Sequence, residues 1–571
     1  MFKDLYMNAR ILAIIFLITS VFACQPDEPS SKQPVMGLIT DSAMVVSAHP
    51  LASQVGVDIL AKGGNAVDAA VAVQFALAVV FPAAGNIGGG GFMLYRSHDG
   101  KTDALDYRET APLASRETMY LDENGEVIED LSRMGHLAAG VPGSVAGMVE
   151  AHKKYGRLSW SELVQPAIDL AKNGFPLTQK EAKGLNGNRE QFQQYNTVTP
   201  HFATRQWAEG DTLQLPHLAE TLMRIRDHKR AGFYEGRTAD LIVAEMKRGN
   251  GIITLEDLNN YHAIWRKPVE GVYKEYKIIS MPPPSSGGIA LIQLLKMIEP
   301  HPLADYGFHS PQAIHYMVEA ERRVYADRAT HLGDPDFYLV PTAHLLDTTY
   351  LKEQMLTVSP TNATPSDSIN AGDFSLYESE ETTHFSIIDT KGNAVAVTTT
   401  LNGSYGSYVV VDSAGFILNN EMDDFSVKPG VPNMYGLVGG KANAILPLKR
   451  MLSSMTPTIL EKNKKLYMVV GTPGGSTIIT SVFQAILNVT EFNMTMQEAV
   501  NAGRFHHQWK PDVILIERNA LDKDTRETLE EMGHRIEERG TIGRVDAILV
   551  RPNRELEGGA DPRGDDAARG F

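Results

Sequence analysis

One stretch of the chain decides the fold: Thr382-Thr383-His384-Phe385-Ser386-Ile387-Ile388-Asp389, which the turn Thr390-Lys391-Gly392-Asn393 joins to Ala394-Val395-Ala396-Val397-Thr398-Thr399-Thr400. Both runs are rich in β-branched residues, and a Gly/Asn turn between two such runs is typical of a β-hairpin. A hairpin brings the start of its first strand next to the end of its second. The sequence therefore predicts that Thr382 and Thr400 are neighbours.

The segment before this hairpin has a different character. Residues 359–381 are polar, contain Pro360, Pro365 and Gly372, and lack apolar periodicity, which predicts an exposed loop. A threonine that opens a strand after such a loop is, taken alone, most often a β-branched residue that suits a sheet. Function must therefore be argued from the residues that accompany it.

Composition sets the broad class. The chain has 571 residues, 43% hydrophobic and 21% charged, which is ordinary for a globular protein with a large core. Asp and Glu number 69 against 53 Lys and Arg, for a formal charge of −16. An acidic surface repels phosphate backbones, so we expect no nucleic-acid partner.

The N-terminus reads as an export signal. Residues 1–23 carry Lys3 and Arg10 before an apolar run that is too short to span a membrane comfortably and is typical of a signal peptide. Cys24, the only cysteine, resembles the lipidated residue of a bacterial lipoprotein, and residues 24–39 form a polar tether. We expect a periplasmic protein held to a bacterial membrane through Cys24; cleavage after Ala23 to release a soluble protein is the alternative. One cysteine excludes disulfides within the chain and cysteine-based zinc sites.

Glycines cluster in the loop at residues 85–91, Gly-Asn-Ile-Gly-Gly-Gly-Gly. The loop does not fit the dinucleotide fingerprint, and it precedes a strand-like run where that fingerprint requires a helix. Close backbone packing is the better reason for these glycines. Residues 145–260 show mostly helical patterns.

Several further motifs occur in one order along the chain, and with them the sequence closely resembles the γ-glutamyltransferases (glutathione hydrolases) of the N-terminal-nucleophile superfamily. The resemblance runs from about residue 40 to the C-terminus. It rests on Leu105-Asp106-Tyr107-Arg108-Glu109, the Pro-Pro-Pro-Ser-Ser-Gly-Gly run at 282–288, residues 382–386, Asn419 to Phe425, Leu452-Ser453-Ser454-Met455, Gly471 to Ser476 and Arg504 to Trp509.

The resemblance implies an α/β (α+β) fold, the four-layer αββα sandwich of N-terminal-nucleophile hydrolases. It implies self-cleavage between Glu381 and Thr382 into a large subunit, residues 40–381, and a small subunit, residues 382–571, intertwined as a heterodimer. Thr382 is the expected nucleophile, and its freed α-amine, with an ordinary pKa of about 7.7–8.0, is the expected base. Thr400 is expected to orient Thr382, and Gly474 and Gly475 to form the oxyanion hole.

The resemblance also implies a site for a zwitterionic γ-glutamyl group. Arg108, Ser453 and Ser454 match the residues that bind its α-carboxylate; Asn402, Glu421 and Asp424 match those that bind its α-ammonium. Tyr435 matches a lid residue. Arg563 matches an arginine that pairs with the aspartate at position 424. Each residue alone is typical of a polar surface or a turn, but six positions in two complementary sets are not.

The expected reaction transfers the γ-glutamyl group of glutathione or a similar amide to water, an amino acid or a peptide, with no cofactor and no metal. His506 and His507 are adjacent, so they point apart on a strand, and we expect them to pack structurally. Two alternatives remain: an acylase for glutaryl or other amides, which would not need the acidic pair Glu421 and Asp424, and a binding protein that never cleaves itself.

Overall fold

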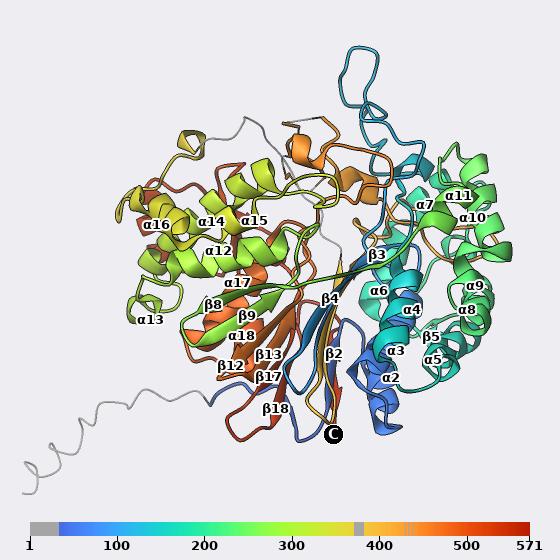
Figure 1. Ribbon diagram of the computed structural model, residues 1–571, viewed down its shortest axis with the longest axis horizontal. Coiled ribbons are helices and arrows are strands. Elements are labelled where there is room, and N and C mark those ends of the chain that lie inside the picture. The colour runs from blue at the N-terminus through green and yellow to red at the C-terminus, as the bar shows by residue number, and fades with distance from the viewer. Residues whose placement is uncertain (1–32, 370–381, 429, 432, 435, 438) are drawn as a thin grey trace, which may run out of the picture. The chain divides into compact units, whose positions relative to one another are not determined.

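Two seven-stranded antiparallel sheets pack against each other in the protein (Figure 1). The computed structural model describes residues 33–369 and 382–571, apart from 429, 432, 435 and 438. One sheet, which we call the hairpin sheet, has the order β19 (Ala567–Gly570), β2 (Met44–Ser47), β10 (Thr383–Ile388), β11 (Ala394–Thr400), β3 (Gly90–Arg96), β4 (Thr102–Asp106), β7 (Ile264–Arg266). The second sheet has the order β1 (Leu38–Thr40), β18 (Leu556–Gly559), β17 (Asp546–Val550), β13 (Lys465–Gly471), β12 (Thr458–Lys462), β9 (Tyr276–Ser280), β8 (Val269–Tyr273).

Helices cover the outer face of each sheet, as Figure 1 shows. The hairpin sheet is covered by α2 (Pro50–Ala61), α3 (Ala66–Val80) and α4 (Ser144–Tyr155), with α5 (Trp160–Asn173) and α8 (Pro216–His228) packed behind them. The second sheet is covered by α12 (Gly287–Ile298), α17 (Thr477–Thr490) and α18 (Met496–Asn501), with α14 (Pro311–His331) packed on α12. The predicted αββα layering is confirmed.

Smaller elements complete the described chain. The helices are α6 (Gln179–Gly187), α7 (Arg189–Tyr195), α9 (Ala231–Tyr234), α10 (Gly236–Arg248), α11 (Leu255–Asn260), α13 (Leu303–Tyr306), α15 (Thr342–Leu345), α16 (Thr348–Leu356) and α19 (Lys523–Glu531). The strands are β5 (Phe175–Pro176), β6 (Thr212–Leu213), β14 (Phe505–His506), β15 (Ile514–Glu517) and β16 (Ile536–Arg539). Residues 145–260 are mostly helical, as predicted.

The alternation of side chains along the hairpin strands explains why both faces of the hairpin are buried. Phe385, Ile387, Val395 and Val397 pack into the core under the helices, whereas alternate residues such as Ala396 pack into the core between the sheets. Successive side chains of a strand point to opposite faces, so a strand that is buried on both faces reads as one continuous apolar run. Alanines on the inner face leave room for the second sheet.

Both parts of the expected precursor contribute to both sheets. In the hairpin sheet, β10 pairs with β2 and β11 pairs with β3. In the second sheet, β12 lies between β9 and β13. Cutting the chain before Thr382 therefore leaves two pieces that share each sheet. Within the described residues, none of the helices combines the length and the apolar character that a membrane span requires.

Candidate active site

The hairpin register sets the position of Thr382. Thr383 pairs with Thr399 across β10 and β11, so the residue before β10 faces the last residue of β11. The Thr382 and Thr400 hydroxyl oxygens lie 3.3 Å apart, and both residues are buried. The predicted contact between the two threonines is confirmed.

Close backbone packing holds the end of β11. A Cβ on Gly89 would lie 2.1 Å from the Thr400 carbonyl oxygen, and a Cβ on Gly91 would lie 2.5 Å from the Thr398 carbonyl oxygen. The glycine-rich loop therefore packs the backbone of β3 against β11, as the sequence predicted. The Asn86 side chain adds a hydrogen bond to the Thr400 carbonyl at 2.9 Å. The Thr400 hydroxyl also accepts the Asn402 N–H at 2.8 Å.

A cavity of about 260 Å³ opens beside the two threonines. Its lining contains nine of the eleven residues that the sequence assigned to the site, together with Leu437, Met455 and Ile478. The nine are Arg108, Thr382, Thr400, Asn402, Glu421, Asp424, Ser453, Ser454 and Gly475. The structure thus brings together nine of the expected site residues from five separate stretches of the chain.

A single 3₁₀ turn places the two expected ammonium ligands on one side. Glu421 and Asp424 begin and end the turn Glu421–Asp424, and side chains three residues apart in a 3₁₀ helix eclipse each other. Both face Arg108: one guanidinium nitrogen lies 2.5 Å from Glu421, and another forms a short ion pair with Asp424. Asp423 points elsewhere and accepts the Ser132 hydroxyl at 2.6 Å and the Met434 N–H at 2.8 Å.

Arg108 follows β4, and its backbone N–H donates to Asp106 at 3.0 Å. The expected carboxylate ligand Arg108 and the expected ammonium ligands Glu421 and Asp424 pair with each other. Burial raises the pKa of both Glu421 and Asp424, while the Arg108 guanidinium opposes the shift. Glu109 is a third buried acid, 3.6 Å from Arg108. Burial raises the pKa of Glu109 as well, to about 8, so three buried carboxyl groups surround Arg108.

The paired serines face the cavity from a clamped segment. The Ser453 backbone N–H donates to Pro284 at 3.0 Å, and the Ser286 N–H donates to the Ser453 carbonyl at 2.7 Å. The Ser285 hydroxyl donates to the Met455 carbonyl at 2.6 Å. The proline- and serine-rich run at 282–288 therefore holds the backbone that carries Ser453 and Ser454.

The turn between β13 and α17 carries Gly474 and Gly475, the two residues expected to form the oxyanion hole. Gly474 and Gly475 have φ of +136° and +52°, conformations that glycine adopts at little cost. A Cβ on Gly474 would lie 2.5 Å from the Thr477 hydroxyl oxygen. Gly475 lines the cavity; Gly474 does not, and adjoins it in the same turn. That Gly474 and Gly475 supply N–H groups to an oxyanion remains a prediction.

Three expectations from the sequence are not confirmed by the structure. Tyr435 and Glu381 lie outside the described residues, so the lid contact and the residue before the cut remain predictions. The expected pairing of Arg563 with Asp424 is wrong: Arg563 forms ion pairs with Glu517 and Asp561. The reason is geometric, because the turn that carries Asp424 directs its carboxylate to Arg108 instead.

The adjacent histidines pack structurally, as predicted. His506 and His507 are fully buried; the first bonds to Thr480 at 2.8 Å and the second to Asp512 at 3.2 Å. Elsewhere in the described residues, His315, Glu319 and His534 lie close enough together to share a metal ion. The Glu319 oxygens, however, already accept Arg323 at 2.7 Å and the Thr364 N–H at 2.9 Å. Hydrogen bonds and an ion pair account for this cluster.

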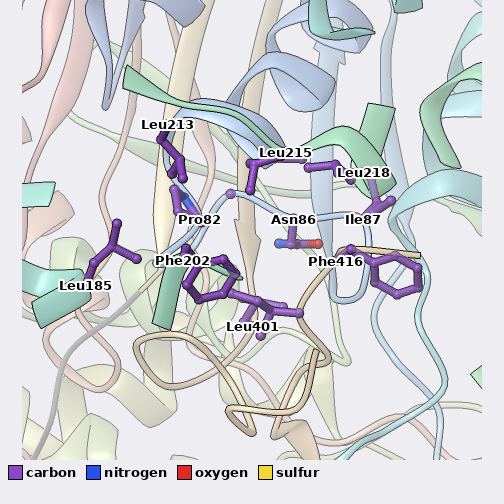
Figure 2. A pocket seen from close by; sticks show the side chains of 14 residues that line it. Pro82, Asn86, Ile87, Leu185, Phe202, Leu213, Leu215, Leu218, Leu401 and Phe416 are labelled. Atoms are coloured by element: carbon purple, nitrogen blue, oxygen red, sulfur yellow. The ribbon is translucent and has the colours of Figure 1, made fainter. Parts of the chain in front are cut away.

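A second cavity, shown in Figure 2, shares no lining residue with the first. It has about 460 Å³ and is lined by apolar side chains, among them Leu185, Phe202, Leu401 and Phe416. Its labelled polar side chain, Asn86, is engaged with the Thr400 carbonyl. This cavity offers no chemistry of its own, and its walls support the end of β11.

Sequence reasoning gave no role to three residues at the site. Glu109 was quoted only as part of a motif, Leu437 lines the cavity, and Arg328 on α14 donates to Ser454 at 3.1 Å. Arg328 lies 126 residues from Ser454 along the chain, and a single arginine in a helical pattern carries no local signal of such a contact.

An αββα sandwich with a threonine at the start of a central strand, beside a cavity of mixed charge, defines an N-terminal-nucleophile hydrolase. Comparison with known proteins makes the assignment more specific. The family model for gamma-glutamyltranspeptidase matches residues 52–571, and the chain belongs to this family.

Individual relatives support the same family assignment. The chain is 46% identical over 538 residues to the glutathione hydrolase proenzyme of Escherichia coli (strain K12), covering 92% of each chain. It is similar in structure to a cephalosporin acylase from Bacillus halodurans, with a TM-score of 0.81 and 25% identity over 96% of this chain and 99% of that one. A gamma-glutamyltranspeptidase from Helicobacter pylori matches with a TM-score of 0.56 and 45% identity over 61% of this chain and 99% of that one.

Proposed function

We propose that the protein is a self-processing γ-glutamyltransferase with glutathione hydrolase activity. The observation that carries this is the contact of Thr382 with Thr400 beside a cavity that holds Arg108 at one end and an acidic pair next to it. Family membership supports this activity over the acylase alternative. The acidic pair also favours it, because a glutaryl group has no ammonium for Glu421 and Asp424 to bind. A binding protein would need no nucleophile at the cavity edge.

Maturation is proposed to begin with Thr382 itself. Its hydroxyl oxygen attacks the carbonyl carbon of Glu381, and the peptide C–N bond breaks as the nitrogen takes a proton. Water then hydrolyses the resulting ester, which leaves a carboxyl group on Glu381 and a free α-amine on Thr382. The relative from Escherichia coli is named a proenzyme, which supports a processed precursor of two subunits.

Catalysis then repeats the same chemistry on a substrate. The Thr382 hydroxyl attacks the γ-carbonyl carbon while the neighbouring α-amine accepts its proton. Backbone N–H groups at Gly474 and Gly475 stabilise the oxyanion. The amide C–N bond breaks, the leaving amine takes the proton, and a γ-glutamyl ester remains on Thr382. Water or an acceptor amine attacks this ester and regenerates the hydroxyl.

Substrate recognition is proposed as an exchange of ion pairs. The α-carboxylate of the donor replaces the acids at Arg108, and its α-ammonium replaces Arg108 at Glu421 and Asp424. Each buried charge keeps a partner throughout, so neither half of the site is left with an uncompensated charge. A ligand with only one of the two charges breaks the internal pairs without replacing both.

A panel of anilides tests the function. We expect hydrolysis of γ-glutamyl p-nitroanilide and little or none of the glutaryl analogue, which lacks the ammonium. Asp424→Asn removes one acidic partner, so its kcat/KM for the γ-glutamyl donor should fall about 10- to 100-fold. The matched control, Asp565→Asn, changes an acid outside the cavity and should leave the rate unchanged. Equal turnover of both anilides by the wild type would contradict the assignment.

For the cellular location, we propose export to the periplasm and anchoring through a lipidated Cys24. The signal-like residues 1–23 and the single cysteine at their end support this. Replacing Cys24 with Ser should release the protein from membranes into the soluble fraction; an unchanged distribution would contradict the anchor.

A further inference from the structure

Arg328 is a buried arginine that the proposed mechanism does not use. It lies on α14 and is 4% exposed. Its guanidinium donates to the Ser286 hydroxyl at 3.0 Å and to the Ser454 hydroxyl at 3.1 Å. No carboxylate in the described part of the chain lies within ion-pair distance of it. Asp424 attracts its charge without forming an ion pair with it. Buried charges in proteins are usually paired, so a buried cation with hydroxyl partners and no ion pair suggests that an anion arrives from outside.

The hydrogen bonds around the paired serines show where that anion would bind. The Ser454 oxygen accepts from Arg328, and the Ser453 oxygen accepts the Met455 N–H at 3.1 Å. A hydroxyl whose oxygen already accepts has its hydrogen left to donate. Among the described residues, no acceptor is found for either hydrogen, and both serines line the cavity. Two donors side by side suit the two oxygens of a carboxylate.

Arg328 also reaches the backbone beneath Ser453. The Ser286 hydroxyl, which accepts from Arg328, donates in turn to the Ser453 carbonyl at 2.7 Å. A planar guanidinium can contact Ser286 and Ser454 at once, whereas the ammonium of a lysine is a point charge on a flexible stem. One side chain thus links both serines from behind the cavity wall.

We propose that Arg328 is a positioning residue for the α-carboxylate of the donor: it fixes Ser454 as a hydrogen-bond donor and supplies a buried positive charge behind it. This rests on the proposed function. Both arginines then supply positive charge to the α-carboxylate, and they differ in that Arg108 forms ion pairs with acids, whereas Arg328 forms none among the described residues. Arg328 acts through Ser454 and does not touch the substrate.

The test compares two variants of Arg328 with a matched control on the same helix. Arg328→Met removes both the positive charge and the planar guanidinium. Arg328→Lys keeps the positive charge but not the guanidinium. Arg323→Met removes another buried arginine of α14, which pairs with Glu319 and not with the cavity. Each is assayed for kcat and KM on γ-glutamyl p-nitroanilide, for processing into two bands, and for Tm. Ser454→Ala is made alone and combined with Arg328→Met.

We expect Arg328→Met to raise KM about 10- to 100-fold with kcat within about 3-fold, because a hydrogen bond to a charged group is lost at the binding step. Arg328→Lys should show a smaller rise in KM. Arg323→Met should lower Tm and leave KM unchanged. The double variant should resemble Ser454→Ala alone, because both changes remove one interaction.

A fall in kcat as large as the rise in KM for the Arg328 variants would show a merely structural role and overturn the proposal. Effects of Arg328→Met and Ser454→Ala that add up in the double variant would overturn it as well. If Arg328→Met does not fold, the same comparison is decided on Arg328→Lys. Failure of the proposed function is distinguishable, because then the wild type itself does not hydrolyse the γ-glutamyl donor.

Discussion

At the scale of single residues, the site depends on where one hydroxyl lies relative to another. Thr382 precedes β10 and Thr400 ends β11, so the hairpin register alone sets their separation of 3.3 Å. Thr400 in turn is held by the Asn402 N–H and by the glycine-rich loop packed on its backbone. The nucleophile is therefore oriented by the strand beside it.

Thr400→Val tests this orientation, because valine has the shape of threonine without the hydroxyl. The change removes the contact to Thr382 and the hydrogen bond that the Thr400 hydroxyl accepts from the Asn402 N–H. Together these should lower kcat about 10- to 100-fold. Thr400→Ser keeps the hydroxyl and should stay within about 3-fold. Single-turnover kinetics on the processed enzyme measure both, and an undiminished rate in the valine variant would remove Thr400 from the mechanism.

At the scale of elements, the turn between β13 and α17 favours glycine at position 474 for two reasons. Its φ is +136°, and a Cβ there would lie 2.5 Å from the Thr477 hydroxyl oxygen, so that the turn or Thr477 would have to shift. Gly392, in the hairpin turn, has φ of +84° but nothing within 4 Å of the same atom. Alanine variants of these two glycines can therefore distinguish the effect of backbone strain from the effect of a steric clash.

We expect Gly474→Ala to lower kcat about 100- to 1000-fold, the usual effect of losing one oxyanion donor. Gly392→Ala carries strain without a clash, so it should lower Tm slightly and leave kcat unchanged. Steady-state kinetics and thermal melts of both variants give the comparison. Similar kcat values for the two would argue against an oxyanion hole at this turn.

Particular elements also show how much the sequence could predict. The hairpin and the glycine packing were predictable because strand periodicity, turn chemistry and the glycine run are local signals. The six expected substrate ligands followed from the resemblance, and all of them line one cavity. The partner of Arg563 and the role of Arg328 were not predictable. Both depend on side-chain directions set by long-range packing, which no local pattern encodes.

At the scale of the whole molecule, burial of neutral histidines sets the response to acid. Burial lowers the pKa of His309 and His534 to about 4, and of His384 and His507 to about 3. In the unfolded chain these imidazoles take up protons below about pH 6.5. At these rings the unfolded state then binds more protons than the folded one, so they lower stability as the pH drops from about 6.5 towards 4.

Buried carboxyls with a raised pKa, such as Glu421 and Asp424, act in the opposite direction, so the contribution of one ring is measured with a variant. We expect the urea midpoint of His309→Gln to fall less, or rise more, between about pH 6.5 and 4 than that of the wild type. His217→Gln, at an exposed position, is the control. A pH dependence of the midpoint that is the same in His309→Gln and the wild type would contradict the assignment of this ring as buried and neutral.

The central claim, that backbone cleavage makes Thr382 a chain end, is tested most directly by intact-mass analysis of the mature protein. The account predicts a small subunit that begins at Thr382 and ends at Phe571, and one uncut, inactive chain for Thr382→Ala. A mature, active protein whose second subunit starts at any other residue, or which is not cut at all, would contradict it.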